Sequence, residues 1–223
     1  DYTNDELLAL YTYTGGVPKY VELLVDNKAL TIPRMIKYVC QSDSPFIDEG
    51  RNLLIQEFGK KYGNYFSILD AISSGMNTQS QIEAFMGEKS IGGQLSKLET
   101  VYEVIKKQRP IFAKEGSQTV RYEVSDNFLR FWFRYIERNR TMIELGNYEG
   151  LARMINEDYP TYSGKTLELY FKQQMQESFD FRDIGSWWEP KGSQNEVDIV
   201  AITLDNKKAF VAEVKRQKKN FKP

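Results

Sequence analysis

Histidine is absent from the 223 residues of this chain, and cysteine occurs once, at position 40. Without histidine, Ser–His nucleophilic catalysis and histidine-ligated metal sites are excluded. A single cysteine excludes a disulfide framework and a cysteine-based zinc site. Long apolar runs are missing too, because no stretch approaches the ~20 residues of a membrane span, and the N-terminus lacks a signal sequence. We therefore expect a cytoplasmic protein without a membrane partner.

Neither sign of charge predominates, since 30 lysines and arginines stand against 31 aspartates and glutamates. The overall charge therefore gives no electrostatic argument for nucleic acid. The length allows two small domains. The start at Asp1 and the stop within a basic run lead us to expect a fragment of a longer protein. Basic residues gather at the end of the chain, where no acidic residue follows Glu213: Lys207, Lys208, Lys215, Arg216, Lys218, Lys219 and Lys222.

A β-hairpin is predicted near the C-terminus. Residues 197–204 are apolar and rich in β-branched side chains, residues 209–214 are mostly apolar, and Asp205-Asn206 between them is a turn signal. We expect Asp205 and Asn206 to form a two-residue loop, so that positions equidistant from this dipeptide become partners across the hairpin.

This register gathers charged side chains at the open end of the hairpin. Asp198 faces Glu213 and Glu196 faces Lys215, and the two-residue period of a strand places all four on one face. Opposed carboxylates repel each other, and a divalent cation or the lysine would remove that repulsion. Carboxylates that hold Mg²⁺, beside a lysine that orients the attacking water, are what metal-assisted phosphodiester cleavage requires. The alternative is a surface hairpin whose Glu213 and Lys215 form a solvated ion pair.

Residues 1–58 are predicted to form a small helical bundle. Gly15-Gly16 marks a break, Pro18 suits the first turn of the next helix, and apolar residues recur at helical spacing. Nothing in this segment is chemically reactive by itself.

Residues 59–126 have the pattern of a winged helix. Three amphipathic helices are expected, of which the second begins after Thr78 and stops at Gly87. The third is expected to be capped by Ser90 and to bury its apolar positions as far as Val101. Two β-prone runs follow, as the wing of this fold requires.

In a winged helix the third helix can enter the major groove of DNA, while cations of the wing contact phosphates. The candidates for such contacts are Gln94, Ser96, Lys97, Lys106, Lys107, Arg109, Lys114 and Arg121. Nine basic and seven acidic residues between positions 60 and 125 are a weak excess for DNA binding. The alternative is a winged helix used only for packing or for contact with a protein.

An aromatic helix is predicted over residues 127–150. Its aromatic residues form one broad stripe (NFLRFWFRYI) and are interleaved with arginines. They could stack bases, but their spacing favours a linking helix that packs two domains together. Residues 151–223 then supply a helix, a strand with Trp187-Trp188 in the core, and the hairpin.

These segments, in this order, resemble the C-terminal part of the archaeal-type ATPases, a branch of the AAA-like signal-transduction NTPases. The resemblance implies an α/β (α+β) fold over nearly the whole chain: a helical lid, a winged helix, and a restriction-endonuclease-like domain of PD-(D/E)XK type with a mixed sheet. No G-x-x-x-x-G-K-[ST] motif is present, so ATP is expected to bind only to the intact protein. The matching stretches are GGVPKYVELL, the winged-helix pattern, SDNFLRFWFRYIERNR, and WW…NEVDIVAI…AEVK.

The resemblance also assigns roles to particular residues. Asp198, Glu213 and Lys215 match the nuclease-like core, and Glu168 matches an acidic residue of the preceding helix. By that resemblance Glu168, Asp198 and Glu213 would bind Mg²⁺ or Mn²⁺, and Lys215 would position the attacking water. A second set, Gly16-Val17-Pro18, matches a G-x-P signature that lies beside the nucleotide base in intact family members.

Two functions are consistent with these residues. The chain is either the part of a nucleotide-regulated ATPase that binds DNA and carries a metal-dependent nuclease-like site, or a catalytically inactive module of the same ATPase that recognises DNA or a protein partner. A purely structural C-terminal half that positions the ATPase is a third interpretation.

Overall fold

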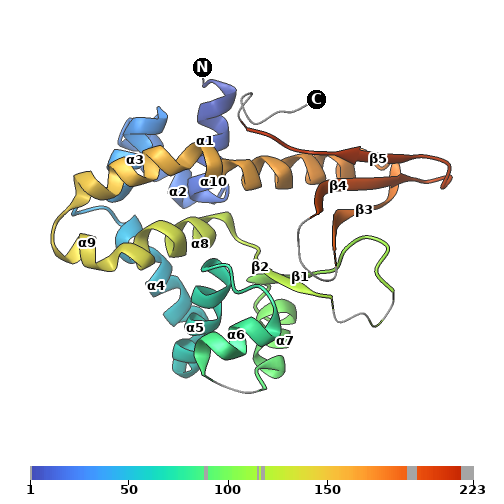
Figure 1. Ribbon diagram of the computed structural model, residues 1–223. Coiled ribbons are helices and arrows are strands. Elements are labelled where there is room, and N and C mark those ends of the chain that lie inside the picture. The colour runs from blue at the N-terminus through green and yellow to red at the C-terminus, as the bar shows by residue number, and fades with distance from the viewer. Residues whose placement is uncertain (1, 88–89, 115, 117–118, 190–194, 217–223) are drawn as a thin grey trace. The chain divides into compact units, whose positions relative to one another are not determined.

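The computed structural model describes residues 2–87, 90–114, 116, 119–189 and 195–216, and its architecture is mixed α+β (Figure 1). The predicted fold class is thereby confirmed. The chain divides into two compact units. Unit 1 comprises Asp1–Lys107 and Tyr122–Tyr159, and unit 2 comprises Gln108–Arg121 and Pro160–Pro223.

The N-terminal segment is helical, as predicted. Its break falls at Gly15 and Gly16, whose φ angles of 62° and 77° lie in the left-handed region that glycine favours. Pro18 is the first residue of the next helix, where its missing N–H breaks no helical hydrogen bond. The four helices are α1 (Asn4–Thr14), α2 (Pro18–Asp26), α3 (Ile32–Cys40) and α4 (Phe46–Phe58).

The only cysteine, Cys40, ends α3 and is buried. This burial raises the pKa of its thiol to about 12. The thiol is therefore protonated at neutral pH.

Three helices and a two-stranded sheet follow in the order predicted for a winged helix. Figure 1 shows the three helices lying together beside the sheet. These elements belong to unit 1, except for Gln108 at the end of β1 and Arg121 at the start of β2. The elements are a 3₁₀ turn η1 (Gly59–Lys61), α5 (Tyr62–Ser73), α6 (Gln79–Met86), α7 (Gly92–Thr100), β1 (Ile105–Gln108) and β2 (Arg121–Val124).

The ends of α6 lie where the sequence predicts them, whereas those of α7 do not. Thr78 is the N-cap of α6 and forms a capping box, and Gly87 is its left-handed C-cap. The prediction that Ser90 caps α7 is wrong, because the N-cap is Ile91 and the Glu83 carboxylate of α6 accepts the N–H groups of Ser90 and Ile91 instead. Val101 is exposed rather than buried, since α7 ends just before it.

The aromatic segment is buried in unit 1, and it forms several short helical segments rather than the single linking helix predicted over residues 127–150. Trp132 is fully buried, and its indole N–H donates to the carbonyl of Ile47 over 3.1 Å. Helix α4 can approach the indole ring because it carries Gly50 there, and a Cβ atom on Gly50 would overlap the ring. The segment comprises α8 (Asn127–Phe131), the π-helical turn η2 (Trp132–Ile136), η3 (Glu137–Asn139) and α9 (Arg140–Glu144).

Replacing Gly50 with alanine is expected to destabilise unit 1 by about 2–3 kcal/mol, because the overlap with Trp132 outweighs a gain in helix propensity of about 1 kcal/mol. Chemical denaturation monitored by circular dichroism would measure the change in the free energy of unfolding. The matched control is Gly63→Ala in α5, where an added Cβ meets nothing within 4 Å. Equal stability of the two variants would contradict this packing.

Helix α10 (Tyr148–Glu177) leads into unit 2, which then forms a three-stranded antiparallel sheet in the order β3-β4-β5. Trp188 on β3 is buried, as predicted, whereas Trp187 is only half-buried. The resemblance implies a mixed sheet, whereas every pairing among the described strands is antiparallel. The strands are β3 (Phe181–Trp188), β4 (Glu196–Thr203) and β5 (Ala209–Ala212).

The β4–β5 hairpin has the predicted register. Ile199 pairs with Ala212 and Ile202 with Ala209, symmetrically about the Asp205-Asn206 dipeptide. The loop is longer than the two residues predicted, because the N–H of Thr203 donates to the carbonyl of Lys208 (3.1 Å) and closes the turn further out. The register is unaffected, since the longer loop is centred on the same dipeptide.

Among the residues that the structure describes, no helix is both long enough and apolar enough to cross a bilayer.

Candidate functional site

The charged site predicted at the open end of the hairpin lies in unit 2, where the β4–β5 ladder ends. Strand β5 stops at Ala212, so the backbone from Glu213 onward has left the ladder. A carboxylate oxygen of Asp198 continues the pairing, because it accepts the N–H of Val214 over 2.8 Å. Asp198 therefore lies beside the backbone between Glu213 and Lys215, the neighbourhood that the register predicts.

Lys215 is surrounded by acidic groups. Its Nζ forms an ion pair with Glu213 Oε2 at 2.6 Å. The hydrogen bond with Glu213 raises the pKa of Lys215, and the charges of Asp198 and Glu168 raise it further. Lys215 is therefore an ammonium group at neutral pH, which can orient water or stabilise an anion but cannot accept a proton.

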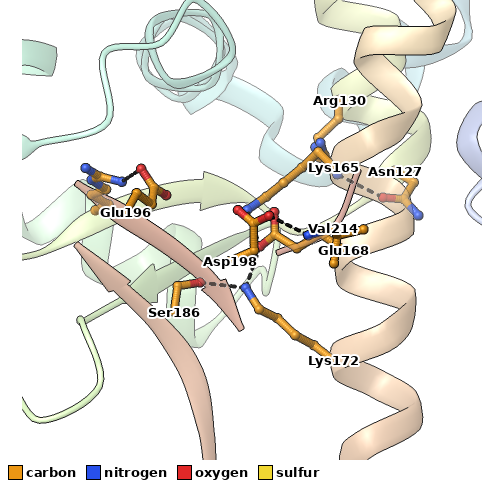
Figure 2. Close-up of polar contacts among 10 residues, drawn as sticks. Asn127, Arg130, Lys165, Glu168, Lys172, Ser186, Glu196, Asp198 and Val214 are labelled. Atoms are coloured by element: carbon orange, nitrogen blue, oxygen red, sulfur yellow. Dashed lines mark hydrogen bonds and ion pairs between the residues drawn. The ribbon is translucent and has the colours of Figure 1, made fainter. Parts of the chain in front are cut away.

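Glu168 is held by two lysines of its own helix. Figure 2 shows Lys165, Glu168 and Lys172 extending from α10 toward the strands. Lys165 Nζ donates to Glu168 Oε1 over 3.0 Å, and Lys172 Nζ contacts the same oxygen. Lys172 also donates to Ser186 Oγ on β3 over 2.6 Å. We call these four side chains the Glu168 cluster.

The protonation of Glu168 follows from these contacts. Burial acts to raise the pKa of Glu168, but the charges and hydrogen bonds of Lys165 and Lys172 outweigh it, so that the pKa lies below its ordinary value. Glu168 is therefore ionised at neutral pH, and its charge is compensated within the cluster.

The three carboxylates predicted as metal ligands are not gathered into one metal-binding group. In the part of the chain that the structure describes, no cluster of three or more Asp, Glu, His or Cys side chains could hold a metal ion. The physical reason is competition: two ammonium groups already neutralise Glu168, and a backbone N–H occupies one oxygen of Asp198.

A smaller metal site would use the two remaining carboxylates, of which Glu213 is ion-paired with Lys215. Mg²⁺ usually keeps several waters and binds through one or two carboxylates together with substrate phosphates. Asp198 and Glu213, which flank Val214, are such a pair. These two residues would hold the metal, which would supply an activated water and offset charge on a phosphate.

Glu196 does not face Lys215 as the register predicts. Its carboxylate pairs with Arg121 at 3.1 Å, and the Arg121 guanidinium lies 4.5 Å from the centre of the Trp188 ring. Arg121, which we predicted as a DNA contact, is thus engaged by Glu196 and Trp188. Position in the sequence could not reveal this partner, because Arg121 and Glu196 are far apart along the chain.

The other predicted DNA contacts are divided between the two units. Arg109 and Lys114 are exposed but belong to unit 2, where the N–H of Ile111 donates to the carbonyl of Ser186 over 2.8 Å. The segment after β1 is therefore bonded to β3 and does not stand free as a wing. The contacts in unit 1 are Gln94, which is half-buried, and the exposed Ser96, Lys97, Lys106 and Lys107.

Sequence reasoning missed Lys165, Lys172 and Ser186. The two lysines carry a local signal, because they lie three residues before and four after Glu168 on a helix, a spacing at which opposite charges meet. Ser186 has no such signal. Lys218, Lys219 and Lys222 of the basic run lie outside the described residues.

The Gly16-Val17-Pro18 signature forms the turn between α1 and α2. The N–H of Gly16 donates to Thr14 Oγ1 over 3.1 Å, and Val17 is the N-cap of α2. Local hydrogen bonding is thus sufficient to explain its conformation.

Comparison with known proteins gives two matches. Residues 132–222 match the DUF234 family, described as archaea bacterial proteins of unknown function. The chain is also 33% identical over 220 residues to an uncharacterized protein of Methanocaldococcus jannaschii. That alignment covers 95% of this chain but 48% of the relative, so the chain spans about half of the relative's length. No solved structure matches the chain. Residues 132–222 are thus similar to the DUF234 family, and the chain is related to an uncharacterized archaeal protein.

Proposed function

We propose that this chain is the DNA-binding C-terminal part of a nucleotide-regulated ATPase of the archaeal type. The observation that carries DNA binding is the order α5–α6–α7–β1–β2, a helix-turn-helix followed by a hairpin, with exposed lysines on α7 and β1. The ATPase assignment rests on the family resemblance. The archaeal relative is about twice as long as this chain, which leaves room in it for a nucleotide-binding domain.

In this proposal α7 is the reading helix. Gln94 and Ser96 would contact base edges, and Lys97 would contact a phosphate. Lys106 and Lys107 are adjacent on β1 and therefore point to opposite faces of the strand. Ile105, which shares a face with Lys107, is buried, so Lys106 lies on the face that points away from the core of unit 1.

The charged side chains at the end of the β4–β5 hairpin support a second function. Asp198 accepts the N–H of Val214 between Glu213 and Lys215, and this places two carboxylates and an ammonium group in one neighbourhood. We propose a metal-dependent phosphodiesterase centre here. Asp198 and Glu213 would hold Mg²⁺ or Mn²⁺, while the Lys215 ammonium orients water and stabilises negative charge on the phosphate.

DNA binding by this chain is expected to weaken steeply with salt, because each neutralised phosphate releases counterions. Reversing one phosphate-contacting charge with Lys106→Glu should lower affinity about tenfold and reduce the salt slope by about 1. Fluorescence anisotropy with a labelled duplex at several salt concentrations would measure both quantities.

Two controls accompany this measurement. Lys107→Glu changes the net charge identically on the opposite face of β1, and Lys207→Glu does so in the hairpin loop of unit 2. Both should have smaller effects than Lys106→Glu. Absence of binding even at low salt would contradict the proposal and favour a module that recognises a protein.

A further inference from the structure

A cavity of about 500 Å³ lies in unit 1, between the start of α5 and the start of α7. Three lysines line it, Lys60, Lys61 and Lys97, together with the side-chain amides of Asn64 and Gln94. No aspartate or glutamate belongs to its lining. The cavity is therefore a concentration of positive charge and hydrogen-bond donors.

The three ammonium groups have no acidic partner among the residues that the structure describes. Like charges that share a cavity without a counter-charge repel one another. A lysine that only solubilises a surface would gain nothing from this placement, whereas a bound anion would offset the repulsion.

The same lysines stand where a helix favours the opposite charge. Lys61 is the N-cap of α5 and makes no capping bond, and Lys60 precedes it in η1. Serine, threonine, aspartate and asparagine are preferred at an N-cap, because the helix start is partially positive and its first N–H groups need an acceptor. The start of α7 differs, because Glu83 Oε1 already accepts the N–H groups of Ser90 and Ile91 over 3.1 and 3.2 Å. An anion in the cavity would therefore compensate the start of α5 and the three lysines.

We infer that this cavity binds a phosphate group, either of a nucleic-acid backbone or of a small phosphorylated molecule. Phosphate oxygens accept hydrogen bonds from ammonium and amide groups, and a volume of about 500 Å³ is in the range of small-molecule sites. The nucleic-acid source rests on the proposed DNA-binding function, whereas the small-molecule source does not. Lys60, Lys61 and Asn64 thereby become binding residues in addition to those predicted on α7.

Gly93 offers a way to test the cavity without disturbing the fold. It lines the cavity, and a Cβ atom added there would meet nothing within 4 Å. Gly93→Glu therefore introduces a carboxylate at the cavity, in the first turn of α7 where an acidic residue is favourable for the helix. Gly93→Gln is the isosteric control without charge. Lys37→Glu on α3 changes the net charge by two at an exposed position outside the cavity.

The experiment has two arms, both with the full chain. In the first, pyrophosphate is titrated and the amide resonances of Gln94 and Leu95 are followed by NMR. In the second, a labelled DNA duplex is titrated and anisotropy is measured. We expect pyrophosphate to shift both amides in the wild type and in Gly93→Gln but not in Gly93→Glu. DNA affinity should fall about tenfold in Gly93→Glu and less in Lys37→Glu.

Each outcome separates this inference from the proposed function. A response in both arms supports a nucleic-acid phosphate, and a response to pyrophosphate alone supports a small phosphorylated ligand. If millimolar pyrophosphate shifts neither amide and Gly93→Glu binds DNA like the wild type, the inference is overturned, although the DNA-binding function stands. If the wild type binds no DNA but responds to pyrophosphate, the proposed function fails and the cavity retains its assignment.

Discussion

Glu168→Ala should destabilise unit 2 by about 3 kcal/mol, because it removes the counter-charge of partly buried lysines. The side chain of Lys172 is 12% exposed, and without Glu168 its ammonium group would keep only the hydroxyl of Ser186 and would repel Lys165. Hydrogen exchange at the β4 amides, measured at increasing denaturant concentration, would report the free energy of unfolding of unit 2. Strand β4 is suited to this because it is the central strand of the sheet.

Two variants test whether the charge balance of the Glu168 cluster is the cause. Lys165→Met removes the lysine whose side chain is 30% exposed, so it should cost less than about 1 kcal/mol. The double variant Glu168→Leu/Lys172→Met replaces both partners of the more buried pair with apolar groups and should recover most of the loss. A Glu168→Ala variant no less stable than Lys165→Met would show that the cluster contributes little to folding.

Acid should reduce the difference between the wild type and Glu168→Ala. The folded-state pKa of Glu168 lies below its ordinary value. The stabilisation is therefore complete above the unfolded-state pKa of about 4.3 and is lost as the pH falls through the lower folded-state pKa. Chemical denaturation at neutral pH and in this acidic range would show whether the difference in unfolding free energy between the two proteins becomes smaller.

Lys215→Ala should lower phosphodiester turnover by about 10²–10³, the loss expected from one preorganised electrostatic group. Metal affinity should be unchanged or slightly higher, because a nearby positive charge is removed. Asp198→Ala should instead abolish both metal binding and turnover. Single-turnover cleavage of labelled DNA with Mn²⁺ and calorimetric titration of Mn²⁺ would separate these effects.

The controls for this prediction lie in the same hairpin. Lys215→Arg keeps the positive charge and should retain more turnover than Lys215→Ala. Lys207→Ala, in the exposed loop, should behave like the wild type. A wild-type chain that neither binds Mn²⁺ nor cleaves DNA would refute the phosphodiesterase centre and leave a module that only binds.

The hairpin was predictable from the sequence because its determinants are local. Two apolar runs and one turn dipeptide are enough to define the pairing of Ile199 with Ala212. The predicted loop length was wrong, yet the register is correct because a symmetric loop preserves it. The cap of α6 at Thr78 and the stop at Gly87 are equally local signals, and both are confirmed.

The partners of the carboxylates were not predictable in the same way. A charge pattern shows which groups can meet but not which of several competing partners wins. Glu168 had two lysines at helical spacing as well as an expected metal, and the lysines hold it in the structure. Glu196 had a register partner, Lys215, but pairs with Arg121, which only the folding of unit 2 brings close.

Packing features were also beyond the sequence. Nothing near Gly50 indicates that the ring of Trp132 will occupy the space above it. Likewise, the cavity depends on bringing Lys60 and Lys61 next to Lys97, which lies on a different helix. Such proximities arise from tertiary structure, whereas periodicity and capping describe single elements.

The burial of Cys40 makes the native chain a convenient starting point for site-specific labelling. Thiol reagents such as maleimides react with the exposed thiolate, and Cys40 is 1% exposed with a pKa raised to about 12. Because the chain has no other cysteine, a cysteine introduced at the surface of each unit would carry the dye or spin label without prior removal of a native thiol. Distances between such labels would then follow the two units as DNA, metal or phosphate is added.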